Sequence, residues 1–147
     1  MRHLSIVLGA KRTGLALGDS FTKLASPLKV IQTPLAEHDG QTLLNQLAEL
    51  IEAELGPSDA VVLGFPLNMD DSEGPRAKLC RAFAAKLRER TGRTILLADE
   101  RRTSVRADQL MAQSGLTHKQ KKLRRDAIAA AAILQGVLDG EIETIPV

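Results

Sequence analysis

The sequence predicts an α/β domain built on a mixed β-sheet, and three observations indicate this class. Two short apolar segments, 4–8 and 13–19, are separated by Gly9 and two basic residues, as expected for a β-hairpin. The segment 59–64 is almost continuously apolar, which is typical of a strand covered on both faces. Later strand-like segments alternate with helix-like ones, the pattern of β-α-β units with parallel strands.

The predicted elements follow one another as β-β-β-α-β-α-β-α-α. This order corresponds to a five-stranded sheet, three antiparallel strands followed by two parallel ones, with helices on its faces. Leucine and isoleucine at i, i+3 and i+4 spacing mark the first helix, and Thr103 is a candidate N-cap for the third. The predicted strands are 4–8, 13–19, 28–32, 59–64 and 94–98. The predicted helices are 40–55, 75–91, 104–113 and 118–138, and residues 139–147 are expected to form a loose tail.

Composition indicates one ordinary globular domain spanning residues 1–147. Hydrophobic residues make up 44% of the chain and charged residues 26%, which argues against disorder. Aromatic residues are only 2%, so base stacking on an aromatic platform is not the expected way of binding nucleic acid. A single cysteine, Cys80, and the lack of a signal-like or membrane-spanning segment favour the cytoplasm.

Charge is distributed very unevenly along the chain. Residues 76–125 hold 15 Lys and Arg against 4 Asp and Glu, a net charge of +11, although the whole chain has a net charge of only +2. A cluster of this size predicts a face that binds a polyanion such as nucleic acid. The alternative is an ordinary solvated helix surface.

The polar loops that follow the two parallel strands are the expected location of a site. Gly64 and Ala98 end these strands, and sites in such sheets form outside the carboxyl ends of parallel strands. The first loop contains Asp70 and Asp71, and the second contains Asp99 and Glu100. Carboxylates from separate elements are therefore expected to converge there.

Four segments together resemble the Holliday-junction-resolvase-like family, also known as the pre-16S rRNA nucleases. Each segment alone is a weak signal, but all four occur in family-like order and spacing, and the resemblance covers about residues 4–138. It implies a ribonuclease-H-like fold, which agrees with the element order above. The segments are Gly9–Ala16, Gly64–Ala77, Asp99–Ser104 and Lys122–Ala130.

The resemblance implies hydrolysis of phosphodiester bonds assisted by Mg²⁺ or Mn²⁺. Such a fold holds two cations between carboxylates from several elements. The implied metal ligands are Glu100 and Asp126, and the implied catalytic residues are these two together with Asp99. Alternatively, Asp99 and Glu100 only favour a helix N-terminus, and Asp126 only forms an ion pair with Arg125 or Lys122.

The first carboxylate that the family implies is missing from this sequence. The family has an aspartate two residues before the hairpin glycine, and counting back from Gly9 gives Val7, which offers no ligand atom. Asp71 also departs from the family, which commonly has glycine there. Asp70 or Asp71 is the better candidate to replace the missing carboxylate, although loop acids facing solvent are the simpler interpretation. Asp19 lies too far along the hairpin.

These features support two functions. The first is a metal-dependent nuclease that processes the 5′ end of precursor 16S rRNA and acts on structured RNA or branched DNA. The second is a weakened or inactive relative that binds nucleic acid or ribosome precursors without cutting, and Val7 is the residue that distinguishes them. The candidate nucleic-acid-binding residues are Lys11, Arg12, Arg101, Arg102, Lys121, Lys122, Arg124 and Arg125.

Overall fold

The structure is a computed structural model that describes residues 1–100 and 117–147. The helix expected at 104–113 lies outside the described residues, as do Arg101 and Arg102.

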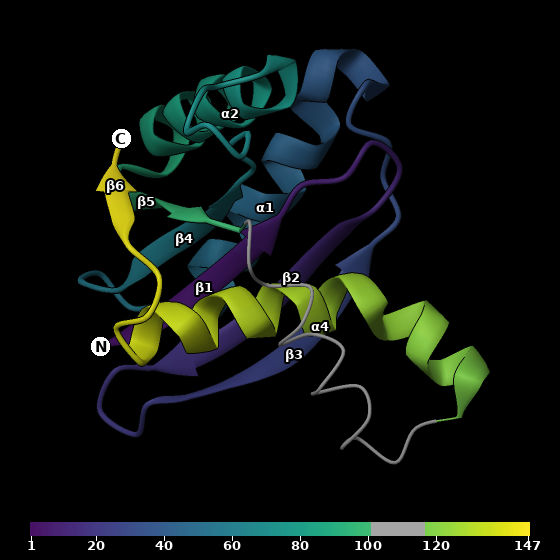
Figure 1. Cartoon of the computed structure of the whole chain (residues 1–147). Coiled ribbons are helices and arrows are strands. Elements are labelled where there is room, and N and C mark those ends of the chain that lie inside the picture. Colours follow the sequence, from purple (N-terminus) through teal and green to yellow (C-terminus); the bar gives the residue numbers. More distant parts are fainter. Residues whose placement is uncertain (101–116) are drawn as a thin grey trace.

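A six-stranded mixed sheet forms the centre of the molecule (Figure 1). Its strand order is β3-β2-β1-β4-β5-β6. β1 pairs antiparallel with β2 and parallel with β4, so the first strand lies in the interior of the sheet. The mixed sheet predicted from the sequence is therefore confirmed. The strands are β1 (Arg2–Val7), β2 (Thr13–Asp19), β3 (Leu24–Ile31), β4 (Ala60–Phe65), β5 (Ile95–Asp99) and β6 (Thr144–Pro146).

Helices cover both faces of this sheet. A short 3₁₀ helix, η1 (Glu37–Gly40), leads into α1 (Gln41–Glu54), which packs with α2 (Pro75–Thr91) on one face. The long helix α4 (His118–Leu138) crosses the other face (Figure 1). The helices predicted at 75–91 and 118–138 occur with these bounds.

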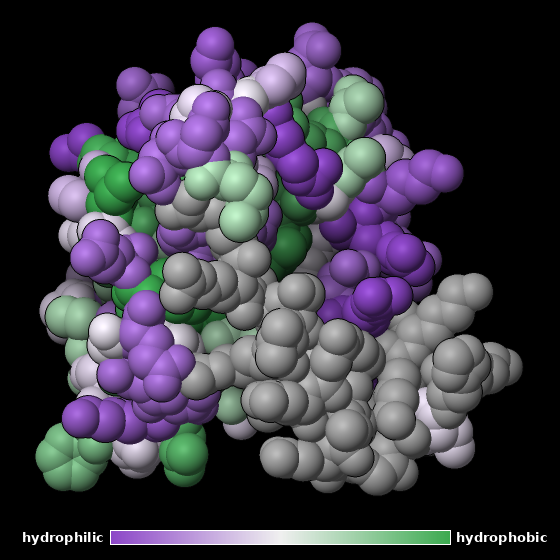
Figure 2. All heavy atoms as spheres, viewed as in Figure 1, coloured by the Kyte–Doolittle hydropathy of each residue, from purple (hydrophilic) through white to green (hydrophobic). Residues whose placement is uncertain are grey.

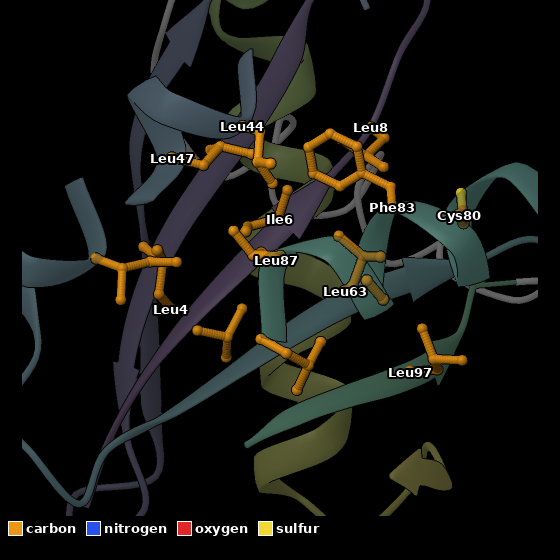
Figure 3. Close-up of a cluster of buried hydrophobic side chains, with 14 of the residues drawn as sticks. Leu4, Ile6, Leu8, Leu44, Leu47, Leu63, Cys80, Phe83, Leu87 and Leu97 are labelled. Carbon is orange, nitrogen blue, oxygen red and sulfur yellow. The ribbon is translucent and has the colours of Figure 1, made fainter. Parts of the chain in front are cut away.

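The larger apolar core lies between the sheet and the helices α1 and α2. Leu4 and Ile6 of β1 and Leu63 of β4 meet Leu47 of α1 and Leu87 of α2, and all five are fully buried. Figure 3 shows these side chains directed into one cluster. Because neighbouring residues of a strand point to opposite faces, the alternate residues of β1 face α4.

Two expectations about strands were wrong. Residues 139–147 are not a loose tail, because Thr144–Pro146 form β6 and pair antiparallel with β5. This strand has only three residues, which is too short to show a periodic pattern. The third strand begins at Leu24 rather than residue 28 and contains Pro27, which an edge strand tolerates. A register shift opposite Leu15 and Ala16 also disturbs its alternation.

Within the described part of the chain, no helix is long and apolar enough to cross a membrane.

Candidate active site

Val7 ends the central strand β1 and faces helix α4. It pairs with Gly14 of β2, whereas its neighbour Ile6 belongs to the core on the opposite face. The half-buried Val7 side chain packs against two buried groups under α4, one containing Ala130 and the other Ile133. The position at which the family resemblance implies a carboxylate is therefore part of an apolar contact between sheet and helix.

Asp126 lies over β2, beside Val7. A Cβ atom added to Gly14 would be 2.0 Å from the backbone carbonyl oxygen of Asp126, so α4 approaches the sheet closely at this point. Only glycine at position 14 leaves room for the helix backbone. The Asp126 carboxylate forms an ion pair with Arg12 from the hairpin turn, with Oδ2 3.5 Å from the Arg12 Nε. Asp126 is thus attached to the hairpin as well as to its own helix.

Glu100 lies over β4, on the other side of Val7. The pairing of Ile6 with Leu63 makes Gly64 the neighbour of Val7 in β4. A Cβ atom added to Gly64 would be 2.6 Å from the Oε2 of Glu100 and 3.2 Å from Ile133 of α4. The carboxylate therefore rests on Gly64 at the α4 face of the sheet.

Burial perturbs the ionisation of Glu100. Loss of hydration raises the pKa of this carboxyl group, the positive charge of Arg76 opposes the rise, and Asp99 adds to it. The backbone N–H of Glu100 also donates a hydrogen bond to the Phe65 carbonyl, at 3.3 Å, which fixes the start of its loop to the end of β4.

The three positions singled out in the sequence are consequently adjacent on one face of the sheet. Asp126 lies over β2, Val7 is on β1 and Glu100 lies over β4. Two carboxylates thus flank an aliphatic side chain. No group of three or more His, Cys, Asp or Glu side chains able to hold a metal occurs within residues 1–100 and 117–147. These residues do not supply the donor set of a two-cation site.

The loop acids Asp70 and Asp71 have local structural roles. Both are exposed. The Ser72 hydroxyl and backbone N–H donate hydrogen bonds to the Asp70 carboxylate, and these bonds lower its pKa. Asp71 has a φ of +68°, in the left-handed region that glycine adopts most easily, which agrees with the glycine that the family resemblance implies at this place. Asp19 pairs with Arg2 at the opposite end of the hairpin.

The sequence did not single out Arg76, which lies at the same end of the sheet. It is the second residue of α2 and is exposed. Its Nη2 donates a 2.7 Å hydrogen bond to the carbonyl of Leu8, the residue that follows Val7. The sequence did offer a signal for a functional role of Arg76. The residue directly follows Gly74 and Pro75, at the start of a helix that comes after a parallel strand.

Cys80 lies inside the core between α2 and the sheet. Burial raises the pKa of its thiol to about 11, and Glu100 contributes to the rise. A thiol in this environment is not a reactive group at neutral pH.

Several candidate nucleic-acid-binding residues lie around the hairpin turn and α4. Lys11 and Arg12 are exposed in the turn, and Arg124 and Arg125 are exposed on α4. Lys121 and Lys122 belong to the same helix. Figure 2 shows hydrophilic side chains gathered on the side of the molecule where the β1–β2 turn approaches α4. Arg12 and the neighbouring Arg125 on α4 therefore lie beside Asp126.

Comparison with known proteins identifies close relatives over nearly the full chain. The family model described as "RuvX: Holliday junction resolvase" matches residues 1–140. A protein of Anaeromyxobacter sp. (strain Fw109-5), named "Putative pre-16S rRNA nuclease", is 43% identical over 140 residues, 95% of this chain and 98% of its own. A protein of Lachnospira eligens with the same name is 36% identical over 96% of this chain and 99% of its own.

Solved structures with the same fold include two Holliday junction resolvases. The chain resembles Thermus thermophilus RuvC bound to a Holliday junction, with a TM-score of 0.59, 14% identity and coverage of 99% and 100% of the two chains. It also resembles the fowlpox virus resolvase in complex with junction DNA, with a TM-score of 0.60, 11% identity and coverage of 95% and 98%. At these identities the likeness shows the fold, which is ribonuclease-H-like.

Proposed function

The chain belongs to the RuvX Holliday junction resolvase family, and from this premise we propose that it is a cytoplasmic nuclease that processes the 5′ end of precursor 16S rRNA. In this proposal the substrate is structured RNA, and the hydrolysed bond is a phosphodiester. The names of the curated relatives and the basic segment support this choice.

The observation that supports the proposal most directly is the placement of Glu100 and Asp126 on the two sides of Val7. One carboxylate from a loop and one from a helix flank the end of the central strand, and metal-assisted hydrolysis of a phosphodiester uses acidic groups from several elements. Arg12, attached to Asp126, would direct a substrate phosphate toward them. Asp99 precedes Glu100 at the end of β5 and contributes negative charge beside it.

Val7 is expected to make cleavage slow. Mg²⁺ or Mn²⁺, when bound, would stabilise the charge that develops during hydrolysis, and Glu100 and Asp126 would be its protein ligands. Losing one of three anionic ligands weakens a site for such a hard cation. A two-cation site does not fit the described residues, so we propose a low activity for this chain.

A second candidate function is binding without cleavage, and Val7 is the specific observation in its favour. The valine is well packed against α4 and leaves the fold intact, while it removes a ligand. A chain of this kind would retain the nucleic-acid face and act on ribosome precursors by binding them.

The experiment compares cleavage and binding of a labelled precursor-RNA hairpin and a four-way DNA junction, with and without Mn²⁺. We expect weak cleavage that Mn²⁺ stimulates and that prefers RNA. Glu100→Gln and Asp126→Asn should each abolish cleavage while leaving the RNA dissociation constant within about threefold, because acidic side chains make no attractive contact with phosphates and affinity comes from basic ones. Asp70→Asn, in the loop, is the matched control and should retain activity.

Two other outcomes would be informative. Binding without cleavage by the unmodified chain would establish the second candidate. Cleavage that persists in both Glu100→Gln and Asp126→Asn would contradict the proposed site.

A further inference from the structure

Two arginines lie on either side of the end of β1, and each reaches it from a different element. Arg12, in the hairpin turn, pairs with Asp126. Arg76, at the start of α2, donates its hydrogen bond to the Leu8 carbonyl and acts electrostatically on Glu100. The Asp126 carboxylate therefore has a guanidinium group next to it, and Glu100 has one within electrostatic reach.

This arrangement changes the charge balance of the site. Three carboxylates at the end of the strand would repel a phosphate until cations neutralise them. With valine in the first position, the two remaining negative charges are matched by the positive charges of Arg12 and Arg76. Asp99 adds one further negative charge beside Glu100, but the described site is still less negative without a metal ion than it would be with aspartate at position 7.

Both guanidinium groups remain accessible to a ligand. The Arg12 side chain is 52% exposed, and Arg76 is also exposed. A guanidinium has five N–H donors in a planar fork, so one ion pair or one bond to a carbonyl leaves donors for a phosphate. Hydrogen bonds between guanidinium and phosphate oxygens are among the stronger ones in proteins.

We propose that Arg12 and Arg76 bind backbone phosphates of the nucleic acid across Val7, and that this binding needs no divalent cation. The inference rests on the proposed function, because it concerns the same site and the same class of substrate. It adds to the proposed function that Arg76 binds a phosphate and that the substrate binds whether or not a metal ion is present. The phosphate then competes with the Asp126 carboxylate for the Arg12 guanidinium. It lies over the uncharged side chain of Val7.

The test measures the affinity of the full chain for a fluorescent stem-loop RNA, in EDTA and in millimolar Mg²⁺ at equal ionic strength. The unmodified chain should bind equally well, within about twofold, in both buffers, because no contact to the phosphate passes through a cation. Arg12→Gln and Arg76→Gln should each weaken binding in EDTA by about five- to tenfold, as expected for losing a charged hydrogen bond.

The matched control is Arg90→Gln, which removes the same charge from the other end of α2. Arg90 is exposed and lies about 21 Å along the helix from Arg76. Its loss should weaken binding by less than about twofold. Arg76→Lys keeps the charge but not the fork, so it should recover only part of the affinity. Arg12→Gln removes no backbone contact, so it tests the proposal even if Arg76→Gln disturbs β1.

Val7→Asp provides the reciprocal test. A third carboxylate should weaken binding in EDTA by about fivefold through repulsion of the phosphate, and Mg²⁺ should restore it. Three results would overturn the inference while leaving the proposed function in place. The first is that Arg12→Gln does not change the affinity for RNA, and the second is that Arg90→Gln weakens it as much as Arg12→Gln does. The third is that the unmodified chain loses its affinity for RNA in EDTA. If the unmodified chain binds no RNA in either buffer, the inference and the proposed function both fail.

Discussion

At the scale of single residues, Val7 suits the folding of the central strand but cannot take part in catalysis as a carboxylate would. A β-branched side chain suits a strand, and this one packs against the alanines of α4. An aspartate at the same place would lose hydration on burial and would lie between Glu100 and Asp126. Valine at this place therefore favours the stability of the fold and offers no ligand atom to a cation.

Glu100 should lower the stability of the protein at neutral pH. Burial raises its pKa in the folded state, so the folded state holds the proton more tightly than the unfolded chain. The free energy of unfolding consequently falls as pH rises from the unfolded pKa of about 4.3 through the raised folded pKa. Glu100→Gln avoids this loss and should be more stable than the unmodified chain at pH 7.

Urea unfolding of both proteins at several pH values tests this prediction. The difference in unfolding free energy should disappear below about pH 4, where both side chains are neutral. Glu89→Gln, on the exposed surface of α2, is the control for removing a carboxylate that is not buried. A difference that is independent of pH would show that packing, and not ionisation, distinguishes glutamate from glutamine at this position.

The sequence predicted part of this site and could not predict the rest. The family resemblance implied that Glu100 and Asp126 would lie near position 7, and the rule that sites form outside the carboxyl ends of parallel strands indicated the place of Glu100. The pairing of Asp126 with Arg12 and the reach of Arg76 to Leu8 depend on long side chains from distant elements. No local pattern encodes such contacts.

At the scale of elements, the closeness of α4 to β2 depends on small residues. The backbone of Asp126 lies directly on Gly14, and buried alanines of α4, among them Ala130 and Ala131, lie against Ala16. Close packing of this kind tolerates added volume poorly, because no space remains to absorb it.

Gly14→Ala should therefore destabilise the protein and displace Asp126. The new methyl group would meet backbone atoms at 2.0 to 2.8 Å, so the helix itself must move. We expect a loss of about 2–3 kcal/mol in the free energy of unfolding, measured in urea, together with loss of nuclease activity. Gly74→Ala is the control, since its methyl group would have only ordinary contacts of 3.4 to 3.8 Å. Equal stability of the two variants would contradict the packing of α4 on β2.

The last strand shows where local patterns fail. The helices at 75–91 and 118–138 could be predicted with their bounds because each repeats an apolar stripe over many turns. β6 has three residues, and its pairing partner is β5, far away in the sequence. It is held by Val147, whose N–H donates to the Ile95 carbonyl, and by the nearby Ile142, which packs against the α4 core.

Removing residues 141–147 should expose the edge of β5. We expect a loss of about 2–4 kcal/mol in unfolding free energy, from the lost apolar burial and backbone hydrogen bonds, and self-association through the open edge. Urea unfolding and size-exclusion chromatography measure the two effects. Ile145→Ser, in a side chain that is 45% exposed, keeps the pairing and should change little. A truncated chain that is monomeric and fully stable would show that β6 is dispensable.

At the scale of the whole molecule, acidic and basic residues are concentrated in different parts of the chain, and these parts form different elements of the fold. Residues 1–75, which hold 10 Asp and Glu against 5 Lys and Arg, supply most of the sheet, whereas the basic segment 76–125 includes α2 and the start of α4. Lys11, Arg12, Arg124 and Arg125 are exposed in the hairpin turn and on α4, so we expect attraction of a polyanion to be strongest on that side of the molecule.

Affinity for duplex nucleic acid should accordingly fall steeply with salt. The logarithm of the association constant decreases with a slope of about −0.9 per neutralised phosphate. Charge reversal at Arg124 and Arg125, both exposed on α4, should flatten that slope by about two. Lys29→Glu, on β3 and outside the basic segment, is the control. A slope that stays unchanged would place the phosphate contacts elsewhere.

The most direct test of the account is the nuclease activity of Val7→Asp. The new carboxylate would lie between Glu100 and Asp126 and complete the ligand set, so Mn²⁺-dependent cleavage of a labelled precursor-RNA hairpin should rise at least about tenfold. A gain of that size needs only about 1.4 kcal/mol of transition-state stabilisation. Without metal, the same variant should be less stable, because three carboxylates then repel one another. Equal and robust metal-dependent cleavage by both proteins would contradict the account, since Val7 would then not be the position that limits the site.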